Sequence, residues 1–127
     1  MIDDKVRHLA RGANFATITT LMADGSPSTH VMWIDCDDDY LLINTETGRV
    51  KFRNVQRDPR VSVVIWDRED AYSYVEVRGR VVETVAGSEA RRHIDELSEK
   101  YHGMPYSNLI ESERVILKVA PDRQRAR

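Results

Sequence analysis

The sequence predicts a mostly β protein with added α-helices, a small closed or split barrel of six mostly antiparallel strands. Apolar residues recur at every second position in several stretches separated by turn sequences, which is typical of antiparallel strands. Only three segments show helical spacing, and they lie before, between and after groups of strands. An open α+β sheet has the same count of elements and remains an alternative at this point.

Composition narrows the class of protein. The chain has 127 residues, 41% hydrophobic and 31% charged, which predicts one globular domain over residues 1–127. The net charge of −2 excludes a generally basic nucleic-acid binder, although a local basic patch exists. No apolar run is long enough for a membrane helix, the lone Cys36 excludes an internal disulfide, and no signal peptide is recognisable. We therefore expect a cytoplasmic protein.

The first half of the chain predicts one helix and three strands. A turn at residues 23–27 contains Gly25, which tolerates positive φ, and an acidic turn at residues 36–39 follows the second strand. Tight turns of this kind predict an antiparallel meander of neighbouring strands. The expected elements are a helix at residues 2–11 and strands at 15–21, 29–35 and 40–45.

The second half predicts two helices and three strands. The strand at 61–66 is nearly all apolar, so we expect it to be central and buried on both faces. Gly79 predicts a bend or bulge in the next, unusually long strand. Residues 121–127 are expected to be a frayed tail. The expected elements are a helix at residues 47–55, strands at 61–66 and 73–85, a helix from Ser88 to Gly103, and a strand at 115–119.

Most sequence motifs of catalysis are absent. The chain has no GxSxG, P-loop or GxGxxG pattern, which leaves hydrolase, NTPase and Rossmann functions without support. Its four histidines lack metal-ligand spacing and are expected mainly at the surface. The acidic residues 35–39 lack the glycine and glutamate of an EF-hand, so a solvated turn is expected there. We predict no metal site and no catalytic side chain.

The basic segment around the second helix is the most informative. Thr45 ends a strand, and Arg49, Lys51 and Asn54 surround a helix start after Gly48. A helix N-terminus offers unpaired N–H groups, and adjacent basic side chains complete a phosphate site. A solvated basic helix face is the alternative, and the residues alone do not decide between the two.

Two tyrosines, Tyr72 and Tyr74, begin the long strand with a spacing that places both on one sheet face. Such a pair packs a core or a dimer contact, or lines a flat aromatic ligand. From the residues alone, packing is the favoured interpretation.

Five sequence blocks in the same order resemble a known superfamily. It is the pyridoxamine-phosphate-oxidase-like superfamily of split-barrel flavoproteins, and the most similar branch is that of small deazaflavin (coenzyme F420)-dependent reductases. The blocks cover nearly the whole chain. They are residues 16–34 with Asp24-Gly25-Ser26-Pro27, residues 45–54, Arg57-Asp58-Pro59-Arg60-Val61, residues 74–79 and Lys100-Tyr101-His102-Gly103.

The resemblance implies an FMN-binding type of split barrel, a homodimer with two cofactor sites at the subunit interface, and site residues by position. The helix start would hold the cofactor phosphate, the second strand would pack against the ring, and two tyrosines would approach from the other subunit. His30 and Val31 are weaker neighbours. The implied cofactor-binding residues are Met32, Trp33, Thr45, Arg49, Val50, Lys51, Asn54, Tyr72 and Tyr74.

The function that the resemblance implies is an oxidoreductase that binds coenzyme F420 and transfers hydride to a small conjugated substrate. An FMN-binding oxidoreductase of the same fold is the alternative; Arg53 and Arg57 would meet the longer acidic tail of a deazaflavin. A non-catalytic flavin or deazaflavin carrier, and a nucleic-acid-binding barrel that uses the patch at residues 49–60, are further alternatives. Pyridoxamine phosphate oxidation itself is not expected, because the chain ends soon after its last strand.

Overall fold

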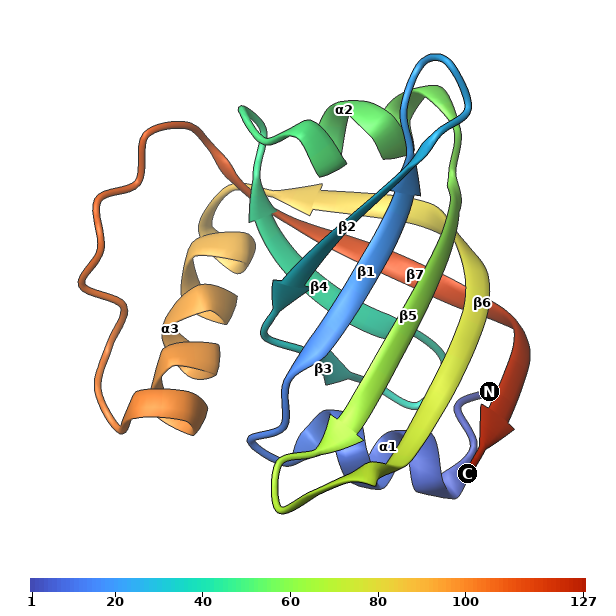
Figure 1. The fold of residues 1–127 in the computed structure, drawn as a ribbon. Helices are drawn as coiled ribbons and strands as arrows, with labels where there is room; N and C mark the ends of the chain where they lie inside the picture. The colour runs from blue at the N-terminus through green and yellow to red at the C-terminus, as the bar shows by residue number, and fades with distance from the viewer.

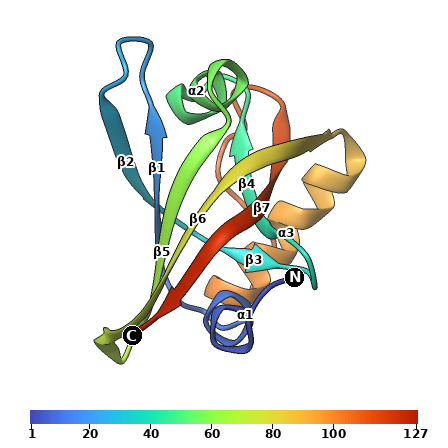
Figure 2. The same cartoon turned by 90° about the vertical axis from the view of Figure 1, so that its right-hand side faces the viewer.

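The computed structural model describes residues 1–127 and contains one seven-stranded antiparallel sheet and three helices (Figure 1). The strand order is β2-β1-β5-β6-β7-β4-β3, and the curled sheet stays open between its edges β2 and β3 (Figure 2). This confirms the mostly β split barrel. The elements are α1 Asp4–Arg11, β1 Ala16–Leu21, β2 Pro27–Met32, β3 Asp35–Cys36, β4 Leu41–Glu46, α2 Val50–Arg57, β5 Arg60–Asp67, β6 Asp70–Ala86, α3 Ser88–His102 and β7 Arg114–Ala126.

The expected meander of the first three strands is wrong. Strands β1 and β2 form the expected hairpin, with Gly25 at φ 87° in its turn. Strand β4, however, pairs with β7 on the far side of the barrel and not with β2. The physical reason is burial: β2 buries only Met32, whereas β4 buries Leu41 and Ile43 inside the barrel. Strand β3 was not expected. It lies at the end of the stretch 29–35 that was predicted as the second strand, and it pairs with β4.

The long strand β6 confirms the role of Gly79. The pairing register of β6 with β7 shifts between Arg78 and Gly79, and again between Val81 and Glu83. A Cβ atom at Gly79 would lie 2.2 Å from the carbonyl oxygen of Ala120. Only glycine permits this close approach of two strands. The bulge bends β6, which pairs with β5 along one edge and with β7 along the other.

The expected frayed tail is wrong. Strand β7 continues to Ala126, which pairs with Val75 of β6. Residues 122–125 carry mostly charged and polar side chains, so no apolar alternation marks them as a strand. Their backbone groups nevertheless complete the ladder along β6, and this pairing does not depend on apolar side chains.

The core fills the interior of the barrel, α1 and α2 lie at its two ends, and α3 lies beside it (Figure 1). Strand β5 alternates between buried inward residues and half-buried outward ones such as Val64 and Trp66, so its expected burial on both faces is wrong. No helix covers the outer face of β2, β1, β5 and β6 in Figure 1. None of the three helices is long and apolar enough to span a membrane. The largest fully buried side chains include Ile18, Leu41, Ile43, Ile65, Val77 and Leu117.

Candidate functional site

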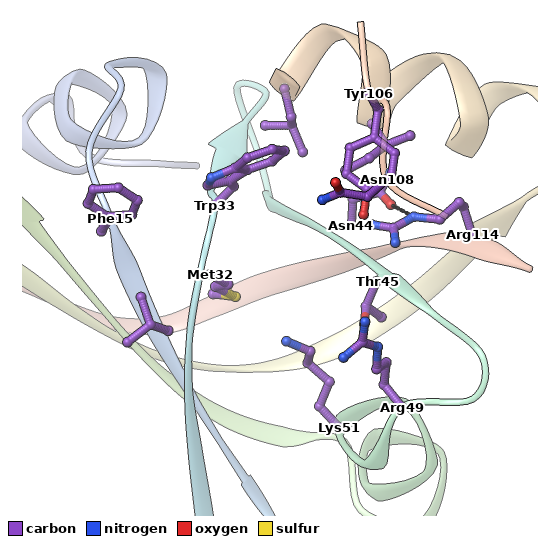
Figure 3. Close-up of a pocket in the computed structure, with 13 residues that line it drawn as sticks. Phe15, Met32, Trp33, Asn44, Thr45, Arg49, Lys51, Tyr106, Asn108 and Arg114 are labelled. Atoms are coloured by element: carbon purple, nitrogen blue, oxygen red, sulfur yellow. Dashed lines mark hydrogen bonds between the residues drawn. The ribbon is translucent and has the colours of Figure 1, made fainter. Parts of the chain in front are cut away.

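A cavity of about 320 Å³ opens between β2, β4, the start of α2, α3 and the segment after α3 (Figure 3). Arg49 and Lys51 point into the cavity from the start of α2, Phe15 and Trp33 lie across from them, and Arg114 lies beside Tyr106. We call the three basic residues Arg49, Lys51 and Arg114 the cationic corner. We call Phe15, Trp33 and Tyr106, together with Tyr101, which stacks on Trp33 without lining the cavity, the aromatic wall. The cavity is lined by Phe15, Val31, Met32, Trp33, Asn44, Thr45, Arg49, Lys51, Ile94, Leu97, Tyr106, Asn108 and Arg114.

The start of α2 supplies two members of the cationic corner. Arg49 is the N-cap residue with extended backbone, and the helix begins at Val50, three residues later than expected. No side chain caps this helix, and the backbone N–H groups of Val50 and Lys51 make no hydrogen bond in the structure. The side chains of Arg49 and Lys51 point into the cavity beside these free donors (Figure 3).

Lys51 has no carboxylate partner in the protein. It is half-buried and makes no ion pair or side-chain hydrogen bond. Desolvation, and then repulsion from Arg49 and Arg114, lower the pKa of its ammonium group. An anion at this position would relieve the repulsion among the three cations.

A buried carboxylate supports the corner from behind. The side chain of Glu46 accepts hydrogen bonds from the N–H groups of Glu111 and Ser112 at 2.9 and 2.8 Å, and from Arg114 Nη1 at 3.2 Å. Burial raises the pKa of the Glu46 carboxyl, but these donors outweigh it and leave the pKa below its usual value. Glu46 is therefore charged at neutral pH and ties the segment after α3 to β4.

The aromatic wall is a stack assembled from distant segments. Trp33 lies parallel to Tyr101, with ring centroids 5.1 Å apart, and Tyr106 meets Trp33 edge-on at 6.2 Å. The Tyr101 hydroxyl donates to the carbonyl of Asn14 and accepts from the N–H of Ile34. Burial raises the pKa of Tyr101 to about 12. The wall is thus fixed by hydrogen bonds as well as by packing.

Helix α3 is attached behind the cavity by a polar network. His8, His30 and His102 are exposed, as expected for most of the histidines, whereas His93 is buried. The Asn44 side-chain amide donates to His93 Nδ1 at 3.1 Å and to the carbonyl of Ala90 at 2.9 Å. His93 Nε2 then faces the Asp35 carboxylate at 3.3 Å. These bonds hold Ile94 and Leu97 of α3 at the cavity wall.

Six of the expected site residues lie together. Met32, Trp33, Thr45, Arg49 and Lys51 line the cavity. Val50 lines a neighbouring cavity of about 500 Å³, together with the weaker candidates His30 and Val31. The two cavities share Val31, Arg49 and Lys51.

Asn54 lies away from the cavity. Its side chain is 2% exposed and donates to Thr20 Oγ1 at 2.9 Å, while its Oδ1 atom accepts from Arg57 at 2.8 Å. Arg57 also donates to the carbonyl of Leu21. Both side chains therefore attach α2 to β1, and neither Arg57 nor Arg53 lines this cavity or the neighbouring one.

The two tyrosines do not reach the cavity of their own chain. Tyr72 is 85% exposed near the start of β6, and Tyr74 borders a separate hollow with Val64 and Arg125. Tyr74 is paired with Trp66 of β5.

Several cavity residues were not identified from the sequence. Arg114 becomes part of the corner because β7 pairs with β4 in a register that sets it opposite Glu46. Tyr106 and Asn108 lie in a segment without regular secondary structure, which carries no periodic signal. The remaining missed residues are Phe15, Asn44, Ile94 and Leu97.

The fold is a small split barrel, and its cavity brings basic and aromatic side chains together. The family model described as pyridoxamine 5'-phosphate oxidase matches residues 2–127, and the chain belongs to this family.

Solved structures with a similar fold agree with this family membership. A protein named F420 reductase is 26% identical, with a TM-score of 0.84 and 98% of each chain covered. A conserved hypothetical protein from Mycobacterium tuberculosis is 25% identical, with a TM-score of 0.78 over 99% of this chain and 84% of that one. General Stress Protein 26 from Bacillus anthracis str. Sterne is 20% identical, with a TM-score of 0.72 over 97% and 91%, and shows the fold alone.

Proposed function

We propose that this protein is an oxidoreductase that binds coenzyme F420 at a dimer interface and transfers hydride to a small conjugated organic substrate. The observation that carries the proposal is one cavity that joins the cationic corner to the aromatic wall. Membership of the pyridoxamine 5'-phosphate oxidase family and the similarity to the protein named F420 reductase support it.

The residues of the cavity fit such a cofactor. Arg49, Lys51 and the free N–H groups at the start of α2 would hold its phosphate. Met32 and Trp33 would lie against its ring. The bound cofactor supplies the hydride chemistry, while the protein binds it, orients it and excludes water from one face.

The second cavity favours a deazaflavin. A deazaflavin has an acidic tail beyond the phosphate, and the cavity lined by Thr29, His30 and Val50 begins at the same Arg49 and Lys51. FMN binding is the second candidate, because the cationic corner and the aromatic wall fit the ring and phosphate that both cofactors share. A nucleic-acid surface is not favoured, since Arg57 and Arg60 are engaged with protein groups and Arg49 and Lys51 face the cavity.

A second copy of the chain would complete the site. Tyr72 is 85% exposed, Val31 is 65% exposed, and the outer face of β1 and β5 has no helix over it. We propose that two copies pack through this face, so that Tyr72 and Tyr74 of each chain approach the cavity of the other.

Separate titrations of the apo-protein with F420 and FMN test the proposal. We expect F420 to bind more tightly than FMN, and light scattering to give about twice the 14.6 kDa chain mass. Tighter binding of FMN would favour the second candidate, and binding of neither would refute both. If the protein binds a cofactor but does not reduce conjugated substrates, a non-catalytic cofactor carrier would be the better interpretation.

A further inference from the structure

Arg114 has a donor that the protein does not use. Its side chain is held on three sides: Nε donates to Asn44 Oδ1 at 2.9 Å, Nη1 donates to Glu46 at 3.2 Å, and the ring of Tyr106 lies 5.3 Å from the guanidinium carbon. The remaining nitrogen, Nη2, makes no hydrogen bond in the structure. The residue is only 8% exposed, and it lines the cavity.

One carboxylate oxygen orients two arginines. Glu46 Oε2 lies 3.2 Å from Arg114 Nη1 and 3.8 Å from Arg49 Nη2. The other oxygen of Glu46 is occupied by the N–H groups of residues 111 and 112. Glu46 therefore cannot turn away without losing these bonds. It holds the Arg114 guanidinium by a hydrogen bond and attracts the more exposed Arg49 guanidinium across 3.8 Å.

The charges of this cluster do not balance within the protein. Arg49, Lys51 and Arg114 carry three positive charges, and Glu46 carries the one negative charge paired with them, which leaves an excess of two. A phosphate monoester, as in FMN, carries about −1.5 to −2 near neutral pH. The phosphate of F420 is esterified on both sides and carries one negative charge, and its acidic tail carries the rest. The excess therefore suits the phosphate of either cofactor, balanced fully by the monoester of FMN or by the phosphate and tail of F420 together.

We propose that Arg114 is a third ligand of the cofactor phosphate, through its free Nη2 atom, and that Glu46 is the positioning residue that aims both arginines at it. This inference rests on the proposed function and adds to it a binding residue from β7. The phosphate is then held from two parts of the chain, the start of α2 and the start of β7.

Paired ligands with and without phosphate isolate this contact. We would measure the affinity of the wild type and of Arg114→Lys for FMN and riboflavin, which differ only in the phosphate. The same comparison is made for F420 and its deazariboflavin core, which lacks both the phosphate and the acidic tail. Lysine keeps the charge beside Glu46 but lacks the planar fork of donors. Arg92→Lys, an exposed exchange on α3 whose arginine faces Glu96 at 3.9 Å, is the matched control.

We expect Arg114→Lys to weaken binding of the phosphate-bearing ligand about tenfold and to leave the phosphate-free ligand unaffected, with no change in Arg92→Lys. An equal loss for both ligands, or no loss, would overturn the inference, because Arg114 would then act on the ring or on the fold alone. If Arg114→Lys does not fold, the double variant Glu46→Gln, Arg114→Gln replaces it, since it leaves no unpaired buried charge.

Inorganic phosphate separates this inference from the proposed function. If the wild type binds neither cofactor, the proposed function fails. Thermal stabilisation by phosphate then decides the role of Arg114. Stabilisation of the wild type that is lost in Arg114→Lys would support the anion site, and equal stabilisation or none would overturn it.

Discussion

The cationic corner and the aromatic wall are held in place by different forces. Arg49 and Lys51 of the cationic corner extend from one short segment and make few contacts with the rest of the protein. The aromatic wall joins Phe15, Trp33 and Tyr101 from separate segments through stacking and buried hydrogen bonds. Changes at the two basic side chains should therefore alter ligand binding with little effect on stability, whereas changes in the wall should alter stability first.

The largest effect on binding is expected at the corner. Arg49→Ala and Lys51→Ala each remove a charge-assisted hydrogen bond worth about 1.5–3 kcal/mol, so cofactor affinity should fall roughly tenfold to a hundredfold. The free energy of unfolding of the apo-protein should change by less than about 0.5 kcal/mol, because neither side chain is buried. Titration and urea unfolding measure the two quantities.

Arg53→Ala is the matched control for the corner, because Arg53 is exposed on α2 and donates only to the carbonyl of Gly48. Affinity equal to wild type in both Arg49→Ala and Lys51→Ala would mean that these residues form a solvated helix face. A large loss of apo stability would make them structural and remove the contrast between the corner and the wall.

In the wall, Tyr101→Phe should reduce stability. The change keeps the ring stacked on Trp33 but leaves the buried N–H of Ile34 without its acceptor, which costs about 1–3 kcal/mol. Urea unfolding of the apo-protein measures this loss. Tyr40→Phe is the control, because the Tyr40 hydroxyl makes no hydrogen bond in the structure. Equal stabilities of the two variants would show that the wall does not depend on the hydroxyl.

A smaller effect is expected for Trp33→Phe. The smaller ring gives up part of the stacking surface offered to the cofactor, and aromatic pairs contribute about 0.5–1.5 kcal/mol, so affinity should fall several-fold. Cofactor binding should quench tryptophan fluorescence in the wild type and in Trp66→Phe, but much less in Trp33→Phe. Unchanged quenching in Trp33→Phe would place the ring elsewhere.

The smallest effect at neutral pH concerns the protonation of Lys51. The charged form of Lys51 binds phosphate, and its pKa is lowered from the usual 10.5. The phosphate-dependent part of the affinity should therefore decline with rising pH, and the decline should begin below pH 10.5. The ratio of riboflavin to FMN dissociation constants at each pH measures this part. Lys51→Arg should move the decline to higher pH, and a decline unaffected by this change would assign the titration to another group.

Local features could be predicted from the sequence because they depend on neighbours along the chain. The helix at the start of the chain, the turn at Gly25, the bulge at Gly79 and the placement of Arg49 and Lys51 at a helix start follow from backbone conformation and spacing. Strand count and periodicity predicted the barrel, and the family resemblance added the second strand as the expected ring-binding surface. Met32 and Trp33 of that stretch line the cavity.

Only the tertiary structure decided which distant segments meet. Strand β4 pairs with β7 because its apolar row needs the barrel interior, and that register sets Arg114 opposite Glu46. Residues 122–125 form a strand through backbone hydrogen bonds, which their side-chain pattern does not reveal. The side chain of Asn54 points into the protein because its amide forms hydrogen bonds there with Thr20 and Arg57. The sequence by itself determined the local conformations and the chemistry at the start of α2, while long-range pairing and burial decided the far side of the cavity.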